Sequence, residues 1–187
     1  MAYSNPGGLY LQRIDTGETY TVSTPDPRFK PAALGWFPDG SRLLAGGFTA
    51  QATDWSLWMI PVLGGSKQVK MGDYRGGLTA IGGAVSPDGS RIAFKSAIGG
   101  APGIWIQGPE GREPRRIVAF GPADALGSLK WTDRNHIELV QLAGDGEGNS
   151  GILSCDVRND RCDTVVSAAD LTGDSLRLPD GRIVFSR

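Results

Sequence analysis

Few side chains in this sequence are suited to acid–base or metal chemistry, and His136 is the only histidine. Zinc and iron centres usually draw on two or more imidazoles, so a lone histidine argues against such sites. A Ser-His-Asp triad would have to use His136, and no GxSxG segment supplies the nucleophile. His136 also takes the place of Arg42, Arg91 and Arg182 at the start of a repeated strand. We therefore expect a surface residue without a catalytic role.

The segment GDGEGN at 144–149 alternates glycine with oxygen-bearing side chains, as a calcium loop would. It lacks the twelve-residue spacing and the terminal bidentate glutamate of an EF-hand. Other repeats have a loop of variable length at this point, so a solvated loop is the favoured interpretation. No motif in the chain requires a metal ion or another cofactor.

Cys155 and Cys162 are seven residues apart, on either side of the segment RNDR. If RNDR is a hairpin turn, the two side chains lie on one face of the strand pair, diagonal to each other. Hairpin diagonals are near the limit of disulfide reach. A disulfide and two unlinked thiols are both open, and unlinked thiols are the simpler interpretation.

Three segments repeat along the chain: WFPDGSRLLAGG (36–47), VSPDGSRIAFKS (85–96) and RLPDGRIVFSR (177–187). KWTDRNHIELVQ (130–141) is a degraded copy, and successive copies are 49, 46 and 46 residues apart. This period is typical of four-stranded propeller blades. In the Pro-Asp-Gly turn, glycine accepts a positive φ and aspartate accepts hydrogen bonds from nearby amides. We assign this structural role to Asp39, Gly40, Asp88, Gly89, Asp180 and Gly181.

The predicted fold is all-β, a β-propeller of four-stranded antiparallel blades in a single domain over 1–187. Twenty-eight glycines and twelve prolines fit many strands joined by tight turns. The chain holds three full blades and two half-blades, about four blades in all. The predicted divisions are half-blade 9–24, blades 33–71, 82–119 and 127–167, and half-blade 175–187. Either the halves pair into a fourth blade, or the chain is a fragment of a larger ring whose unpaired strands associate.

With these segments in view, the chain resembles the WD-like repeats of TolB-type propellers over essentially its whole length. The succession LYLQRIDTGE, WFPDGSRLLAGG, SLWMIPVLGGS and GGAVSPDGSRIAF resembles, more narrowly, the propellers C-terminal to bacterial serine/threonine kinase domains. This resemblance implies a bacterial sensing or docking module, cytoplasmic or periplasmic according to its parent protein. Similar propellers precede α/β-hydrolase domains, so one alternative is the substrate-gating propeller of a prolyl-oligopeptidase-like peptidase. A second alternative is a self-associating homo-oligomeric fragment.

Composition and motifs exclude several classes of binding partner. A net charge of −1 argues against nucleic acid, and no apolar run approaches the ~20 residues that insert directly into a membrane. No kinase motif is present, so we expect a non-catalytic module that binds a protein, a peptide or a small ligand. Phe48 and Trp55 bound a long loop and are the candidate partner contacts, with packing inside the loop as an equal alternative. Trp36 is expected in the core.

Overall fold

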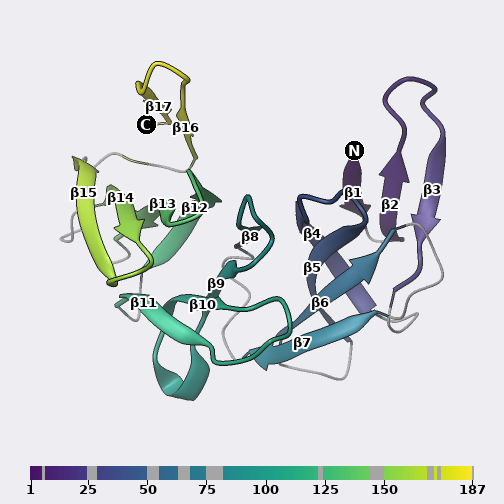
Figure 1. The fold of residues 1–187 in the computed structure, drawn as a ribbon, viewed down its shortest axis with the longest axis horizontal. Helices are drawn as coiled ribbons and strands as arrows, with labels where there is room; N and C mark the ends of the chain where they lie inside the picture. Colours follow the sequence, from purple (N-terminus) through teal and green to yellow (C-terminus); the bar gives the residue numbers. More distant parts are fainter. Residues whose placement is uncertain are drawn as a thin grey trace.

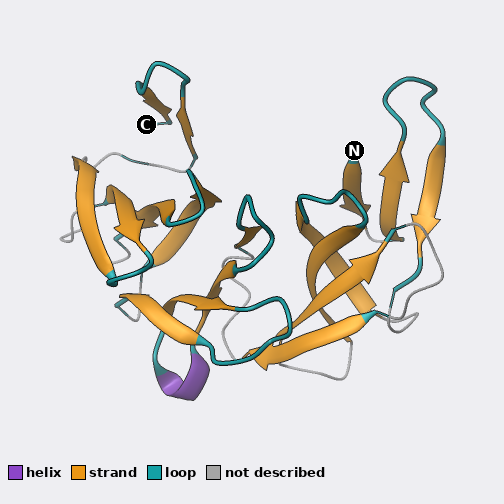
Figure 2. Cartoon of the chain, viewed as in Figure 1, coloured by secondary structure: helices purple, strands orange, loops and turns teal. Residues whose placement is uncertain are grey.

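A computed structural model describes residues 1–5, 7–24, 29–49, 55–62, 68–74, 82–121, 124–143, 150–167, 171 and 174–186. The glycine-rich segment 144–149 and residues 50–54 of the loop between Phe48 and Trp55 lie outside these ranges. Within the described residues, the regular structure is β-strand apart from the short 3-10 helix η1 (Ile98–Gly100), as Figure 2 shows. The same residues contain no helix long and apolar enough to cross a membrane.

The strands of the described residues form five antiparallel sheets that follow one another along the chain. Sheet 1 contains β1 (Ala2–Asn5), β2 (Gly8–Gln12) and β3 (Thr19–Val22). Sheet 2 contains β4 (Phe29–Trp36), β5 (Arg42–Thr49), β6 (Trp55–Pro61) and β7 (Val69–Tyr74). Sheet 3 contains β8 (Gly83–Val85), β9 (Ile92–Ser96), β10 (Gly103–Gln107) and β11 (Arg115–Ala119). Sheet 4 contains β12 (Ala125–Trp131), β13 (His136–Leu142), β14 (Gly151–Asp156) and β15 (Arg161–Ser167). Sheet 5 contains β16 (Ser175–Arg177) and β17 (Ile183–Phe185).

Three four-stranded sheets flanked by incomplete ones confirm the predicted fold class, but sheet 1 has one strand more than expected. In β1, Tyr3 pairs with Tyr10 of β2, just as Phe94 of β9 pairs with Trp105 of β10. Tyr3 therefore holds the second-strand position that Phe94 holds in sheet 3. No Pro-Asp-Gly turn precedes β1, so the repeat does not predict this strand.

The extra strand bears on whether the first and last sheets together form one four-stranded blade. The second-strand position is filled by β1 in sheet 1 and again by β17 in sheet 5, and the two sheets are separate. They therefore do not merge into one four-stranded blade, which was one of the two alternatives from the sequence. Figure 1 shows the five sheets along an open arc, with sheet 1 and sheet 5 at its two ends.

Successive residues of each second strand pack against opposite neighbouring sheets. In β9, Ile92 and Phe94 pack in a buried cluster with Leu44 of sheet 2. Between them, Ala93 packs in another cluster with Ile137 of sheet 4. This alternation follows from the two-residue period of a strand that is covered on both faces. Each complete sheet thus has one face toward the preceding sheet and one toward the following sheet.

Sheet 5 is attached to sheet 4 by an apolar cluster and by a buried carboxylate. Ile183 and Phe185 pack against the cluster around Val140. Glu138 of β13 is 0% exposed and accepts hydrogen bonds from Arg177 Nη2 at 2.6 Å and Nε at 2.8 Å. Lys130 Nζ lies 2.9 Å from the other carboxylate oxygen. Burial raises the pKa of Glu138, but the two cations outweigh it and hold that pKa below its usual value.

Candidate binding pocket between sheets 1 and 2

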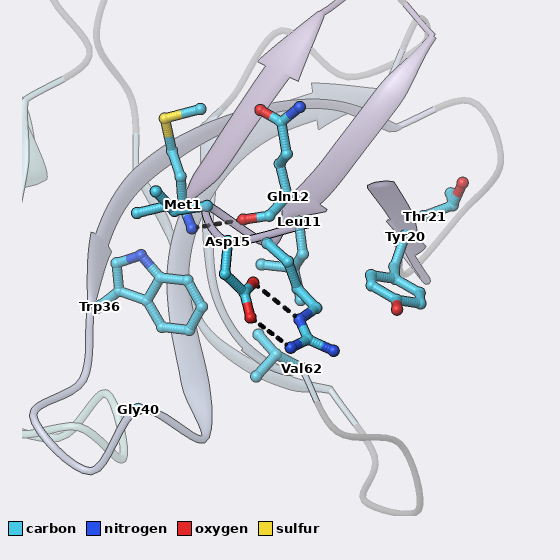
Figure 3. A pocket seen from close by; sticks show the side chains of 11 residues that line it. Met1, Leu11, Gln12, Asp15, Tyr20, Thr21, Trp36, Gly40 and Val62 are labelled. Carbon is cyan, nitrogen blue, oxygen red and sulfur yellow. Dashed lines mark hydrogen bonds and ion pairs between the residues drawn. The ribbon is translucent and has the colours of Figure 1, made fainter. Parts of the chain in front are cut away.

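A cavity of about 830 Å³ opens between sheet 1 and sheet 2 (Figure 3). Its walls come from Met1, the hairpin between β2 and β3, the end of β4, the following Pro-Asp-Gly turn and the residue after β6. The lining residues are Met1, Leu11, Gln12, Arg13, Ile14, Asp15, Tyr20, Thr21, Trp36, Gly40 and Val62. The site therefore depends on the packing of sheet 1 against sheet 2.

Local sequence features place these side chains at the pocket. Trp36 is the last residue of β4, and the turn that begins after it reverses the chain at Gly40, whose φ is 68°. Across the cavity, the hairpin between β2 and β3 turns at Gly17, with a φ of 73°. Both glycines adopt the left-handed conformation that other residues disfavour. Two tight turns thus bring Trp36 and Tyr20 to one opening.

The pocket gathers large apolar side chains that are open to solvent. Trp36 is 39% exposed, Tyr20 49%, Met1 59% and Ile14 86%. Apolar and aromatic side chains that line one concave site, with a few polar groups beside them, are typical of binding pockets. Trp36 was expected in the core, and this expectation is wrong. Tyr20 and Ile14 carried no sequence signal, because only the packing of the two sheets joins them to Trp36.

Charged groups form one wall of the pocket. Arg13 Nη2 donates to Asp15 at 2.6 Å, and Tyr20 Oη donates to Glu18 at 2.8 Å. Arg13 lowers the pKa of Asp15, while the carboxylate of Glu18 raises the pKa of Tyr20. Figure 3 shows Asp15 between Trp36 and Tyr20 in this view. The cavity therefore combines apolar walls with a paired, charged edge.

The two residues that the sequence singled out for partner contact lie elsewhere, on strands β5 and β6. The rings of Phe48 and Trp55 are 5.7 Å apart and tilted toward each other, and both side chains are half-buried. Trp55 also lies over Gly46, where an added Cβ would come within 2.9 Å of the indole. The pair contributes to packing within sheet 2. Its role in partner contact stays a prediction.

The Pro-Asp-Gly turns share one hydrogen-bonding pattern. The carboxylates of Asp39, Asp88 and Asp180 each accept from the backbone amide two residues later, at 3.0–3.1 Å. Asp88 also accepts from the hydroxyls of Ser86 and Ser90, and these bonds lower its pKa to about 2. Gly40, Gly89 and Gly181 all have φ between 68° and 87°. These carboxylates are occupied within their own turns.

His136 is the first residue of β13 and directly follows the degraded turn of the third repeat. Its Nδ1 lies 2.8 Å from Asp133 Oδ2, and its Nε2 lies 3.9 Å from Asp156 Oδ2. Asp156 is itself paired with Arg158 at 2.7 Å. One ring nitrogen thus faces the turn residue Asp133, and the other faces Asp156 at the end of β14. Among the described residues, no group of three or more histidine, cysteine or acidic side chains is arranged to hold a metal ion.

A disulfide joins Cys155 of β14 to Cys162 of β15. The two residues are direct cross-strand partners, so the expected diagonal placement is wrong. The bridge is part of the cluster between sheets 3 and 4, where Cys155 is 0% exposed. It therefore closes the hairpin that completes sheet 4.

Reduction of this disulfide is expected to lower the free energy of unfolding by about 2–3 kcal/mol, because the bridge restricts a short loop in the unfolded chain. Urea unfolding with and without a phosphine reductant measures the difference, and thiol titration verifies the redox state. A variant with both cysteines replaced by serine serves as the control, since reductant should leave its stability unchanged. Equal stability of the oxidised and reduced wild-type chains would contradict the prediction.

No protein-family model and no curated protein matches the chain. Solved structures do match. TolB from Acinetobacter baumannii aligns over 98% of this chain and 45% of its own, with 16% identity and a TM-score of 0.71. The chain has a β-propeller fold.

Two enzyme structures carry propellers similar to this one. Oligogalacturonate lyase from Vibrio parahaemolyticus aligns over 93% of this chain and 51% of its own, with 14% identity and a TM-score of 0.68. A puromycin-hydrolysing peptidase from Mycobacterium tuberculosis aligns over 97% and 32%, with 15% identity and a TM-score of 0.69. The propeller spans between about a third and about a half of these three proteins. At such identities the likeness establishes the fold.

Proposed function

We propose that this propeller is a non-catalytic module that binds a segment of a protein or peptide in the pocket between sheets 1 and 2. One observation carries the proposal: Met1, Ile14, Tyr20 and Trp36, all substantially exposed, line the same cavity. Tryptophan and tyrosine in concave sites are the residues that most often dominate protein–protein affinity. The Arg13–Asp15 pair at the edge suits the polar groups of a peptide backbone.

The absence of catalysis is part of the proposal. His136 is the one side chain suited to general acid–base work near neutral pH, and its two nitrogens face the carboxylates of Asp133 and Asp156. The repeated aspartates are engaged by the amides and hydroxyls of their own turns. These groups support the strands rather than a reaction, which leaves binding as the role of the surface.

A finer role rests on the order of sequence motifs. That order favours the sensory or docking part of a bacterial serine/threonine-kinase-like regulatory protein, with the pocket as its ligand site. Removing the propeller from such a parent protein should then change the regulation of the kinase. Unchanged regulation would contradict this finer role while leaving the pocket itself untouched.

A second candidate is supported by the likeness to the puromycin-hydrolysing peptidase. In this case the propeller would gate access to a hydrolase domain on the same polypeptide, and the pocket would hold part of a peptide substrate. A GxSxG-containing domain in the parent protein would decide for this candidate, and a kinase domain would decide for the first.

The binding proposal predicts a large effect of Trp36→Ala. Random 12-residue peptides displayed on phage are selected on the purified chain, and a selected peptide is measured by isothermal titration calorimetry. We expect selected peptides with apolar and aromatic side chains, and a Kd at least about 30-fold weaker for Trp36→Ala, as is typical of a buried aromatic anchor.

A matched control is the double variant Phe48→Ala and Trp55→Ala, which removes the other candidate contact pair, on β5 and β6. The pocket proposal expects its affinity to equal that of the wild type. Loss of binding in the double variant, with Trp36→Ala unaffected, would place the contact on the Phe48–Trp55 pair. Circular dichroism spectra of all variants establish that the fold is retained.

A further inference from the structure

The hairpin between β14 and β15 of sheet 4 contacts the edge strand β11 of sheet 3. Arg115 of β11 donates from Nη2 to the backbone oxygen of Val157 at 2.7 Å, and its Nη1 forms an ion pair with Asp160. Val157 is itself 1% exposed in the apolar cluster between sheets 3 and 4. One arginine thus links the turn of this hairpin to the neighbouring sheet.

The turn of this hairpin has a backbone conformation that its surroundings must maintain. Asp160 has a φ of 59°, in the left-handed region that residues other than glycine seldom adopt. At the other end of the turn, the amide of Val157 donates at 2.8 Å to the backbone oxygen of Asn135. The carboxylate of Asp160 therefore reaches Arg115 only while the turn keeps this conformation.

The disulfide closes this turn directly. Cys155 and Cys162 are cross-strand partners, and the next pair, Asp156 and Arg161, borders the turn. A covalent bridge across a short turn limits the conformations that the turn can adopt, because it fixes the distance between the two ends of the loop. Cys155 is 0% exposed, whereas Cys162 is half-buried. Cys162 is therefore the residue of the pair that a reductant can reach.

We propose that the Cys155–Cys162 disulfide is a redox switch for the contact between sheets 3 and 4. The thiolate of a dithiol reductant attacks Cys162 and forms a mixed disulfide there, and the sulfur of Cys155 leaves as a thiolate that takes up a proton. The second thiol of the reductant then displaces Cys162, which also becomes a thiol. The protein gains two electrons and two protons, and the reductant becomes a disulfide. Reduction leaves β14 and β15 paired but frees the turn, which weakens its contact with Arg115.

The equivalent hairpin of sheet 3 forms a contact that a reductant cannot alter. There Gly111, with a φ of 75°, lies so close to the backbone oxygen of Met71 in β7 that a Cβ would not fit. Two backbone segments make this contact, and both cysteines of the chain are in sheet 4. The contact between sheets 2 and 3 therefore serves as a reference within the same molecule.

The test is amide hydrogen exchange of the oxidised and the reduced chain, measured by mass spectrometry where both forms retain the native circular dichroism spectrum. We expect reduction to raise exchange in 156–163 and in β11 at least about tenfold, because opening of the turn is no longer opposed by a covalent bridge. Exchange in β7 should change less than about twofold. The double variant Cys155→Ser and Cys162→Ser should not respond to the reductant.

Arg115→Gln distinguishes a switch from a bridge that only supports its own hairpin. This variant lacks the link between β11 and the turn, so reduction should still raise exchange in 156–163 but change that of β11 less than about twofold. Arg112→Gln is the control and should respond as the wild type does, since Arg112 is 81% exposed and pairs with Glu110.

Two results in the wild type would overturn the proposal. One is an increase confined to 156–163, because the disulfide would then not act on sheet 3. The other is an equal increase in β7, because reduction would then loosen the whole chain. The test is independent of peptide binding, since every residue that lines the pocket lies within 1–62.

Discussion

Phe94→Ala is expected to lower the free energy of unfolding by about 3–5 kcal/mol, the usual cost of deleting a buried aromatic ring. Phe94 is 1% exposed in the cluster that joins sheets 2 and 3, together with Leu44, Leu57 and Met71. This cluster is the buried apolar contact between sheets 2 and 3. The cavity would therefore weaken a boundary between two sheets as well as one strand. Urea unfolding followed by tryptophan fluorescence measures the change.

Tyr20→Ala is the matched control for Phe94→Ala. Tyr20 is also a large aromatic residue on a strand, but it is 49% exposed at the pocket. Its removal should cost less than about 1 kcal/mol, as substitutions on the surface usually do. Both measurements use a concentration at which the chain is monomeric. Similar losses for the two variants would mean that the cluster around Phe94 does not hold sheets 2 and 3 together.

Glu138→Gln is expected to lower the free energy of unfolding by about 2–3 kcal/mol at pH 7, the range for hydrogen bonds to a charged group. The substitution preserves the shape of the side chain and removes the charge that Arg177 and Lys130 neutralise. Because sheet 5 is attached to sheet 4 at this carboxylate, amide hydrogen exchange should rise most in 175–186. Urea unfolding and exchange mass spectrometry give the two readouts.

The effect of Glu138 should depend on pH in one direction. The pKa of Glu138 in the folded chain lies below its ordinary value of 4.5, so ionisation stabilises the fold above that value. This stabilisation is lost as the pH falls through the folded pKa. The difference between wild type and Glu138→Gln should therefore be greatest near neutral pH and shrink below pH 4.5. A difference that grows in acid would contradict this account.

A surface ion pair provides the control for the charge effect. Glu110 lies 3.0 Å from Arg112, and their side chains are 69% and 81% exposed. Solvent screens such pairs, so Glu110→Gln should change the free energy of unfolding by less than about 0.5 kcal/mol at any pH. An equal effect of the two substitutions would show that burial of Glu138 does not strengthen its ion pairs.

The features that could be predicted from the sequence are those formed by residues close together in the chain. The Pro-Asp-Gly turns are local, because the aspartate, the amide that it binds and the glycine with positive φ are all within four residues. Their recurrence was sufficient to predict the strands that flank them. β1 has no such turn, and it was missed although it has the second-strand position of sheet 1. The disulfide was left open because its cross-strand register depends on a hairpin conformation that RNDR does not specify.

The repeat, the all-β class and the role of the turn residues could be predicted from the sequence, since each depends on contacts between near neighbours in the chain. The position of the pocket depends instead on how the sheets pack. Trp36 and Tyr20 line one pocket because sheet 1 packs on sheet 2, and Tyr3 is half-buried while its counterpart Phe94 is buried. An apolar strand residue has the same local pattern in both situations. Its burial depends on which sheet lies against it, and that is a property of the assembled fold.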